Sequence, residues 1–230
     1  ILASLGGGNM LQSNSIADVM ETVFKIDPLY TGLILAAFMG LILLGGIKTI
    51  GRVASVLVPV MAILYLLGAL VVIVLCYEVL PQAIAQILIH AFTPHAAVGG
   101  FIGSTIMMAM QVGVSKGLMT SEAGLGTASI AAAAAKTDLP GRQAMVSMTS
   151  SFLSTVIMCS VTALVLGVTQ VLGSVNTDGE AIMGASLTAL AFDSIVPNGS
   201  YIVAISVILF GFTTILGWSY YSERCLVYLV

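Results

Sequence analysis

The stretch GVSKGLMTSEAGLGT, residues 113–127, decides the fold of this chain. It places Lys116, Glu122 and four glycines inside an apolar tract that extends from residue 97 to residue 136. One straight α-helix over that tract would be about 60 Å long, at about 1.5 Å per residue. The hydrocarbon core of a bilayer is only about 30 Å thick. We therefore predict that the helix is interrupted inside the membrane.

The glycines of this stretch suggest where the interruption lies. Gly113 and Gly117 each weaken a helix interior by about 1 kcal/mol, which predicts an unwound segment at about residues 111–117. Unwound backbone is tolerated at membrane depth only where protein or a water-filled cavity satisfies its polar groups. Interrupted helices of this kind hold substrates and ions in many secondary transporters. The alternative is a short cytoplasmic loop at 113–121, followed by a second helix.

Polar residues next to the glycines predict how the chain continues. Thr120 or Ser121 is expected to cap a new helix, with Glu122 in its first turn, where the helix dipole favours a negative charge. A charge such as that of Lys116 is costly in lipid, so it should face a cavity or a partner. We expect Lys116, Ser121 and Glu122 to have structural or gating roles.

The composition sets the class of the protein. Hydrophobic residues make up 59% of the chain and charged residues 7%, whereas soluble domains contain about 25% charged residues. Long apolar runs without alternation indicate an all-α polytopic membrane protein that has the lipid bilayer as its surroundings. A net charge of −3 and the lack of a basic cluster argue against a nucleic-acid partner. We expect one transmembrane domain over residues 1–230, incomplete at both ends.

The apolar runs predict six core helices. They are expected at about 1–20, 29–47, 53–76, 97–136, 142–172 and 199–221. The segments 78–100 and 173–200 each contain an apolar stretch too short to span, as in interfacial helices.

Charges sort by side along this series of helices. One set of turns carries Lys48, Arg52, Lys136, Arg142 and Arg224. The opposite set carries Glu21, Asp27, Glu78, Asp178, Glu180 and Asp193, with Lys25 as its cation. The positive-inside rule makes the first side cytoplasmic.

Two helices carry polar faces. Asn9, Gln12 and Ser13 are spaced three and four residues apart, so they share a helical face that should look into the bundle or a cavity. If that segment is a loop, the same residues are merely solvated.

The last predicted helix presents Thr214, Trp218 and Tyr221 on one face, with Thr213 beside it. Two adjacent threonine hydroxyls could supply part of an oxygen shell for Na⁺. The alternatives are hydroxyls bonded back to their own helix and a tryptophan in the interfacial aromatic belt.

These segments resemble a known family. GVSKGLMTSEAGLGTASIAAAAAKTDLPGRQAMVSM (113–148) is similar to the sodium:alanine symporter family, as are GGNMLQSNS (7–15), GGIKTIGRVASVLVP (45–59) and FTTILGWSYYSERCL (212–226), in the same order. The resemblance implies a leucine-transporter-like fold of two inverted repeats. This chain would supply its third to eighth core helices, including the discontinuous sixth.

The resemblance also implies roles for individual residues. Gln12, and less directly Asn9, would face the substrate, and the unwound backbone at Val112 and Gly113 would bind its charged ends. Thr214 and Trp218 would close the pocket around a small neutral amino acid such as alanine or glycine. Thr213 and Thr214 would contribute to a site for Na⁺, the coupling ion.

The chain departs from the family pattern at several polar positions. Lys116 stands where the family usually has Arg, and Ser121 where it has Asn. Lys keeps the charge but loses the bidentate geometry of Arg. These changes bear on gating and on substrate preference.

The predicted function is Na⁺-coupled symport of alanine or glycine by alternating access, in the plasma membrane of a prokaryote. A proton-coupled amino acid transporter of the same fold is the first alternative, and an ion channel is a second. Channels present filter motifs or rings of charge, which this sequence lacks. An enzyme is not expected, because Gly-Ala-Ser-Leu at 184–187 has no histidine on a later span and no HExxH motif is present.

Overall fold

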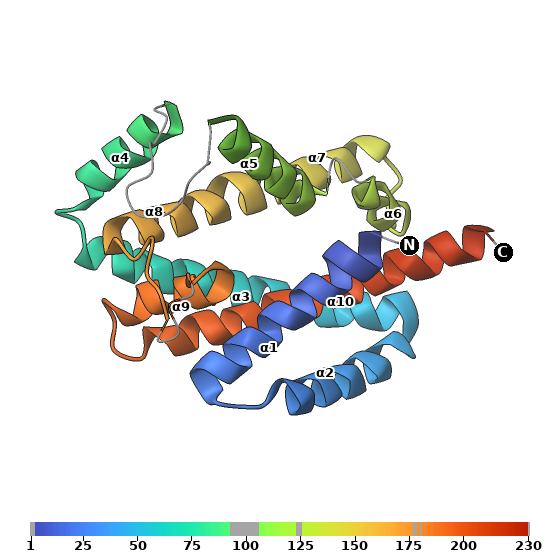
Figure 1. Ribbon diagram of the computed structural model, residues 1–230. Coiled ribbons are helices and arrows are strands. Elements are labelled where there is room, and N and C mark those ends of the chain that lie inside the picture. The colour runs from blue at the N-terminus through green and yellow to red at the C-terminus, as the bar shows by residue number, and fades with distance from the viewer. Residues whose placement is uncertain (1–2, 93–105, 123–125, 177–178, 180, 230) are drawn as a thin grey trace. The chain divides into compact units, whose positions relative to one another are not determined.

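The computed structural model describes residues 3–92, 106–122, 126–176, 179 and 181–229 (Figure 1). This described part is helical apart from its connecting segments and an isolated β-bridge between Val175 and Ala181. It forms two compact units, Ile1–Leu75 with Thr169–Val230 and Cys76–Val168, and each is considered by itself. The all-α prediction is confirmed.

The first unit contains two short and four longer helical segments. They are η1 (Ser4–Met10), α1 (Leu11–Phe24), α2 (Pro28–Leu43), α3 (Gly46–Leu75), α9 (Gly184–Asp193) and α10 (Gly199–Leu229). Segment η1 is π-helical and continues directly into α1. Helix α1 ends at the left-handed Lys25, with φ of 58°. Helix α2 then begins after Asp27, whose Oδ1 accepts a 2.8 Å hydrogen bond from the Leu29 N–H.

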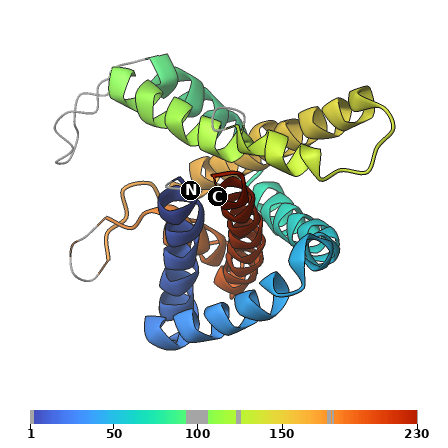
Figure 2. The ribbon, with the colours of Figure 1, turned by 90° about the vertical axis from the view of Figure 1, so that its right-hand side faces the viewer.

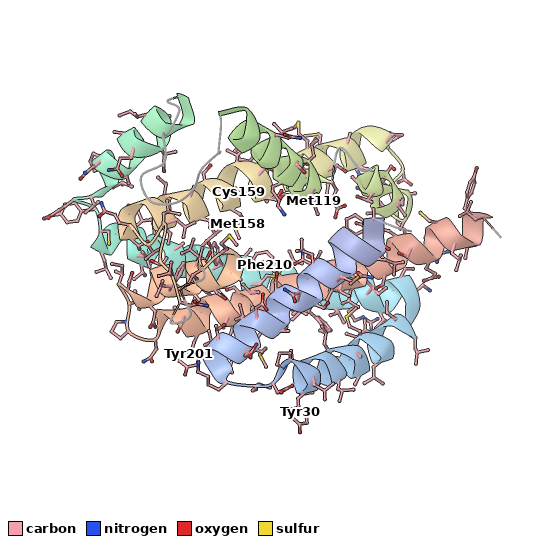
Figure 3. The ribbon with its side chains drawn as sticks, viewed as in Figure 1. Tyr30, Met119, Met158, Cys159, Tyr201 and Phe210 are labelled. Carbon is pink, nitrogen blue, oxygen red and sulfur yellow. The ribbon has the colours of Figure 1, made fainter. Side chains whose placement is uncertain are left out.

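Helices α1 and α10 lie antiparallel and side by side (Figures 1 and 2). Four contacts keep one register along them: Ser4 with Ser222, Gly8 with Trp218, Ile16 with Gly211, and Phe24 with Tyr201. Figure 3 shows Tyr201 beside the C-terminal end of α1, where its ring centroid lies 5.4 Å from that of Phe24. This register fixes which residues of the two helices are neighbours.

Helix α3 also packs antiparallel to α10. Residues further along α3 contact residues earlier in α10: Met61 contacts Thr213, Tyr65 contacts Phe210, and Gly68 contacts Ile202. The start of α3, with Lys48 and Arg52, therefore lies at the same end of the unit as Arg224. The predicted sorting of basic residues to one side holds within this unit, and the cytoplasmic assignment of that side stays a prediction.

The core of this unit lies where α1, α3, α9 and α10 meet. Its most deeply buried large side chains are those of Val19, Val72, Phe192, Val203 and Leu216. Large apolar side chains elsewhere point outward, as for Tyr30 on α2, which is 62% exposed (Figure 3). Exposed apolar surface of this extent suits a lipid environment rather than water.

The second unit contains α4 (Leu80–Phe92), α5 (Ile106–Ser121), α6 (Thr127–Ala133), α7 (Pro140–Ser151), η2 (Phe152–Met158) and α8 (Cys159–Thr169). The last three form one long helix with a π-helical segment in its middle. Helix α4 packs on α8, where a Cβ added to Gly167 would lie 3.4 Å from Ala83 and Ile87. Helix α5 packs beside α7 and η2.

The predicted unwound segment at 111–117 is wrong. Helix α5 is continuous from Ile106 to Ser121, and the interruption follows it. Glu122 is left-handed, with φ of 55°, and α6 begins after Gly126, which has φ of 71°. Isolated glycines lower helix stability by only about 1 kcal/mol each, which neighbouring turns can offset. Helix α5 instead ends just before the left-handed Glu122, and α6 starts just after the left-handed Gly126.

Three helices of the described part are long and apolar enough to cross a bilayer: Gly46–Leu75, Pro140–Thr169 and Gly199–Leu229. Each has 30 or 31 residues, about 45 Å at about 1.5 Å per residue. The predicted spans 53–76, 142–172 and 199–221 correspond to them. The short helices α4 and α9 fall in the segments predicted to hold them. The part of the 97–136 tract before residue 106 lies outside the described residues.

Candidate functional site

Trp218 is held between α10 and η1. The side chain is 6% exposed, and its ring lies against the Cα of Gly8, where an added Cβ would be 2.4 Å from Cγ and Cδ2. Tyr221 packs edge-on to the indole at 5.8 Å between ring centroids. A tryptophan fixed on two sides in this way is a rigid wall for whatever lies beside it.

Gln12 lies on the same contact, one turn from Gly8 along η1 and α1. Its carbonyl oxygen would be 3.5 Å from a Cβ added to Gly211, and its side chain is half-buried. The register therefore places Gln12 at the level of α10 that carries Thr214, one turn before Trp218. The structure thus packs the helix that carries Gln12 against the helix that carries Thr214 and Trp218.

Asn9 lies in the π-helical segment, directly after the glycine that receives Trp218. Its Oδ1 is buried and has no hydrogen-bond partner in the described part of the chain. Most buried polar side-chain atoms in proteins are hydrogen-bonded, so an orphan calls for an explanation. π-Helical turns occur frequently at functional sites.

The hydroxyls of Thr213 and Thr214 bond back to their own helix. Thr213 Oγ1 donates toward the carbonyls of Leu209 and Phe210 at 3.0 and 3.1 Å, and Thr214 Oγ1 donates to Phe210 at 2.7 Å. The structure therefore shows the alternative in which the two threonine hydroxyls bond back to their own helix. Because a hydroxyl that donates keeps two lone pairs, both oxygens still fit a role as cation ligands.

Val112 and Gly113 lie in the second unit, inside α5. Both are interior residues of a continuous helix, so their peptide groups belong to its hydrogen-bonded turns. The expectation that unwound backbone at these positions binds a charged ligand loses its structural basis.

The interruption after α5 is spanned by a side-chain contact. Thr127, the first residue of α6, donates from Oγ1 to Glu122 Oε2 at 3.3 Å. Ser121 does not cap the next helix, because it ends α5 and its hydroxyl lies 3.5 Å from the Leu118 carbonyl. Thr120 bonds back to Lys116 in the same way, at 2.9 Å, and the Lys116 side chain is exposed. The predicted N-cap at Thr120 or Ser121 is wrong.

Sequence reasoning missed two features of the contact between η1 and α10. Gly8 is required by the tryptophan ring, and the hydroxyls of Ser4 and Ser222 meet one turn further along. The run of three glycines before Asn9 was a signal of close helix approach, since small residues let backbones come together. The sequence could not identify Trp218 as the residue that packs on Gly8, because the register between η1 and α10 was not known.

Long apolar helices with buried polar groups between them, together with an interrupted helix, define a polytopic α-helical membrane protein. The chain belongs to the sodium:alanine symporter family, whose sequence profile matches residues 1–230.

Curated relatives agree with this assignment. The chain is 46% identical over 229 residues to the sodium/alanine symporter AgcS of Methanococcus maripaludis, covering 99% of this chain and 49% of that protein. It is 46% identical over 232 residues to an uncharacterized transporter of Haemophilus influenzae, covering 100% and 50%. It is 36% identical over 230 residues to a sodium/proton-dependent alanine carrier protein of a Bacillus species, covering 96% and 51%. The chain thus spans about half the length of these relatives.

Proposed function

We propose that the protein moves a small neutral amino acid, alanine or glycine, across the plasma membrane together with Na⁺. The family and the names of two relatives, a sodium/alanine symporter and a sodium/proton-dependent alanine carrier, support this function. Transport would follow alternating access, in which part of the helix bundle rocks around a site near mid-membrane.

The register of α1 against α10 is the observation that carries the proposal. It puts Gln12 at the level of Thr214, with Trp218 one turn away. In the proposed site Gln12 and Asn9 face the substrate, Thr214 and Trp218 close the pocket, and the fixed indole limits the side chain to a small one.

Sodium is proposed to bind near Thr213 and Thr214. Both hydroxyl oxygens are fixed by bonds to carbonyls of the preceding turn, so they are oriented before the ion arrives. Ion binding that orders the substrate site would raise substrate affinity, and by linkage the substrate would raise sodium affinity.

The interrupted helix has a supporting role in this proposal. Glu122 joins the end of α5 to the start of α6 through Thr127, and Ser121 and Lys116 lie in the last turns before the break. These residues would stabilise the break and a gate rather than touch the substrate. Val112 and Gly113 are left out of the proposed site, because their peptide groups lie within helical turns.

The test is uptake of labelled alanine into vesicles that contain the full-length protein. A sodium gradient should drive accumulation, and replacement of Na⁺ by choline should abolish it. Thr214→Val should raise the half-saturating sodium concentration about tenfold, the effect of about 1.4 kcal/mol of lost ligand energy. Thr188→Val is the matched control, because Thr188 makes the same kind of bond, to the Gly184 carbonyl at 3.3 Å, on α9. Uptake of equal rate in choline would refute sodium coupling.

Proton coupling is a second candidate, since one relative is named a sodium/proton-dependent carrier. A protonophore separates the two cases. If protons contribute to the driving force, collapse of the pH gradient at constant sodium gradient should lower alanine accumulation. Unchanged accumulation would leave sodium as the coupling ion.

A further inference from the structure

Helix α3 exposes one apolar face along most of its length. Successive residues of that face are three or four positions apart and each is more than half exposed: Val56, Val60, Ile63 and Leu67. The opposite face of the helix is buried and packs against α10. In a membrane protein an exposed apolar face of this length is in contact with lipid acyl chains.

Two cations lie on the same face, in the first two turns of α3. Arg52 comes four residues before Val56, and Lys48 comes four residues before Arg52, so all three side chains share one side of the helix. Both cationic side chains are exposed, and neither has an ion-pair partner among the described residues. The sequence from residue 28 to residue 77 contains no aspartate or glutamate. No acidic side chain of α2 or α3 therefore neutralises these two charges.

The length of α3 indicates the depth of the two cations in the membrane. The helix carries no charge from Val53 to Leu75, a distance of about 34 Å at about 1.5 Å per residue. This length matches the hydrocarbon core of a bilayer, which is about 30 Å thick. With the uncharged part in the hydrocarbon core, Arg52 and Lys48 lie in the layer of lipid headgroups.

We propose that this face of α3 binds an anionic phospholipid, with the lipid phosphate on Lys48 and Arg52 and an acyl chain along the exposed apolar residues. Such a lipid presents a negative charge followed by a hydrocarbon chain, which is the complement of the order along α3. The guanidinium of Arg52 suits a phosphate, because it can donate two parallel hydrogen bonds to it. A soluble phosphate would meet the cations alone and leave the apolar side chains uncovered.

The test measures lipid binding to the full-length protein in detergent, by native mass spectrometry during a titration with phosphatidylglycerol. Phosphatidylcholine with the same acyl chains should bind about tenfold more weakly, because its own cation offsets the phosphate charge. Lys48→Gln and Arg52→Gln should each raise the apparent Kd for phosphatidylglycerol about fivefold, the effect of about 1 kcal/mol for one cation near a lipid headgroup. Neither variant should change the binding of phosphatidylcholine.

Arg224→Gln is the matched control, because it removes one positive charge from the same end of the unit. The Arg224 guanidinium is already engaged: Nη2 lies 3.5 Å from Glu223 Oε1, and Cζ lies 5.0 Å from the centre of the Tyr220 ring. This variant should therefore keep the wild-type Kd for phosphatidylglycerol. Arg52→Lys, which retains the charge, should keep the Kd within about twofold.

Three results would overturn the inference. Equal affinity for phosphatidylglycerol and phosphatidylcholine would show that the two cations do not select the headgroup. Equal weakening by Arg52→Gln and Arg224→Gln would assign the effect to the overall surface charge. Displacement of the lipid by an equal concentration of glycerol 1-phosphate would mean that the cations bind a soluble anion and that the apolar face adds nothing. Because binding is measured without transport, none of these results depends on the proposed function.

Discussion

The α1–α10 contact and the α5–α6 segment use small residues in opposite ways. Gly8 of η1 and Gly211 of α10 each lie where a side chain from the other helix fills the space, that of Trp218 in the first case and that of Ile16 in the second. Along α5, Gly113 and Gly117 have no described atom within 4 Å of an added Cβ. Gly8 and Gly211 are therefore needed for close packing of the two helices, whereas no described neighbour requires a glycine at residue 113 or 117.

This difference shows what a glycine in a membrane helix means. A glycine that receives a neighbour's side chain fixes how two helices approach, and it leaves the helix intact. A glycine marks a helix boundary when its backbone is left-handed, as at Gly126, which has φ of 71° and directly precedes α6. Gly113 satisfies neither condition in the described structure, so its presence in the sequence did not mark the break.

The largest effect is expected from Gly8→Ala. The new Cβ would lie 2.4 Å from Cγ and Cδ2 of Trp218, near the rigid base of the ring, so the helices must move apart. Overpacking of this kind costs about 1–3 kcal/mol, and we expect the upper end. Thermal denaturation of the full-length protein in detergent measures the loss.

Gly6→Ala is the matched control for this change. No described atom lies within 4 Å of a Cβ at Gly6, and alanine is favoured over glycine in a helix by about 0.5–1 kcal/mol. The control should therefore be neutral or slightly more stable. Equal destabilisation by the two variants would mean that Gly8 is needed for helix shape rather than for the tryptophan.

A smaller change in stability is expected to distinguish Gly126 from Gly113 as the position of the helix break. Gly126→Ala should cost about 1–2 kcal/mol, because an L-residue is strained at its φ of 71°. Gly113→Ala should stabilise the protein by about 0.5–1 kcal/mol, because it lies in the interior of α5. Denaturation midpoints of the two variants give both values. If Gly113→Ala destabilised the protein and Gly126→Ala did not, the helix would be interrupted near Gly113 instead.

The sequence predicts the helices and their polar faces well, because these depend on local periodicity. Trp218 and Thr214 lie on one face of α10, because a four-residue step stays on one face of a continuous α-helix. Asn9 and Gln12 are separated by the junction between the π-helical η1 and α1, where this rule does not hold. The apolar runs predict the end of α3, both ends of the helix Pro140–Thr169 and the start of α10 to within about three residues. Helix α3 begins seven residues before the predicted start at 53, and α10 continues eight residues past the predicted end at 221.

Other features depend on interactions that the sequence does not display. The position of the helix break depends on the left-handed backbone of Glu122 and Gly126. Glutamate rarely adopts this conformation, so the sequence does not predict it at residue 122. The π-helical turns at Asn9 and Thr155 have no sequence signature that we could use. The partner of Gly8 became known only once the register of α1 against α10 was known.

The smallest effect concerns the far end of the α1–α10 contact, where Phe24 and Tyr201 meet edge to face at 68° between ring planes. Such a pair contributes about 0.5–1.5 kcal/mol beyond its buried area. Phe24→Leu and Tyr201→Leu, with the double variant, form a cycle that isolates the pair energy. We expect a coupling of about 1 kcal/mol from denaturation midpoints. A coupling energy near zero would mean that the Phe24–Tyr201 pair does not help to fix the register of α1 against α10. The register would then depend on the contacts at Gly8 and Gly211 alone.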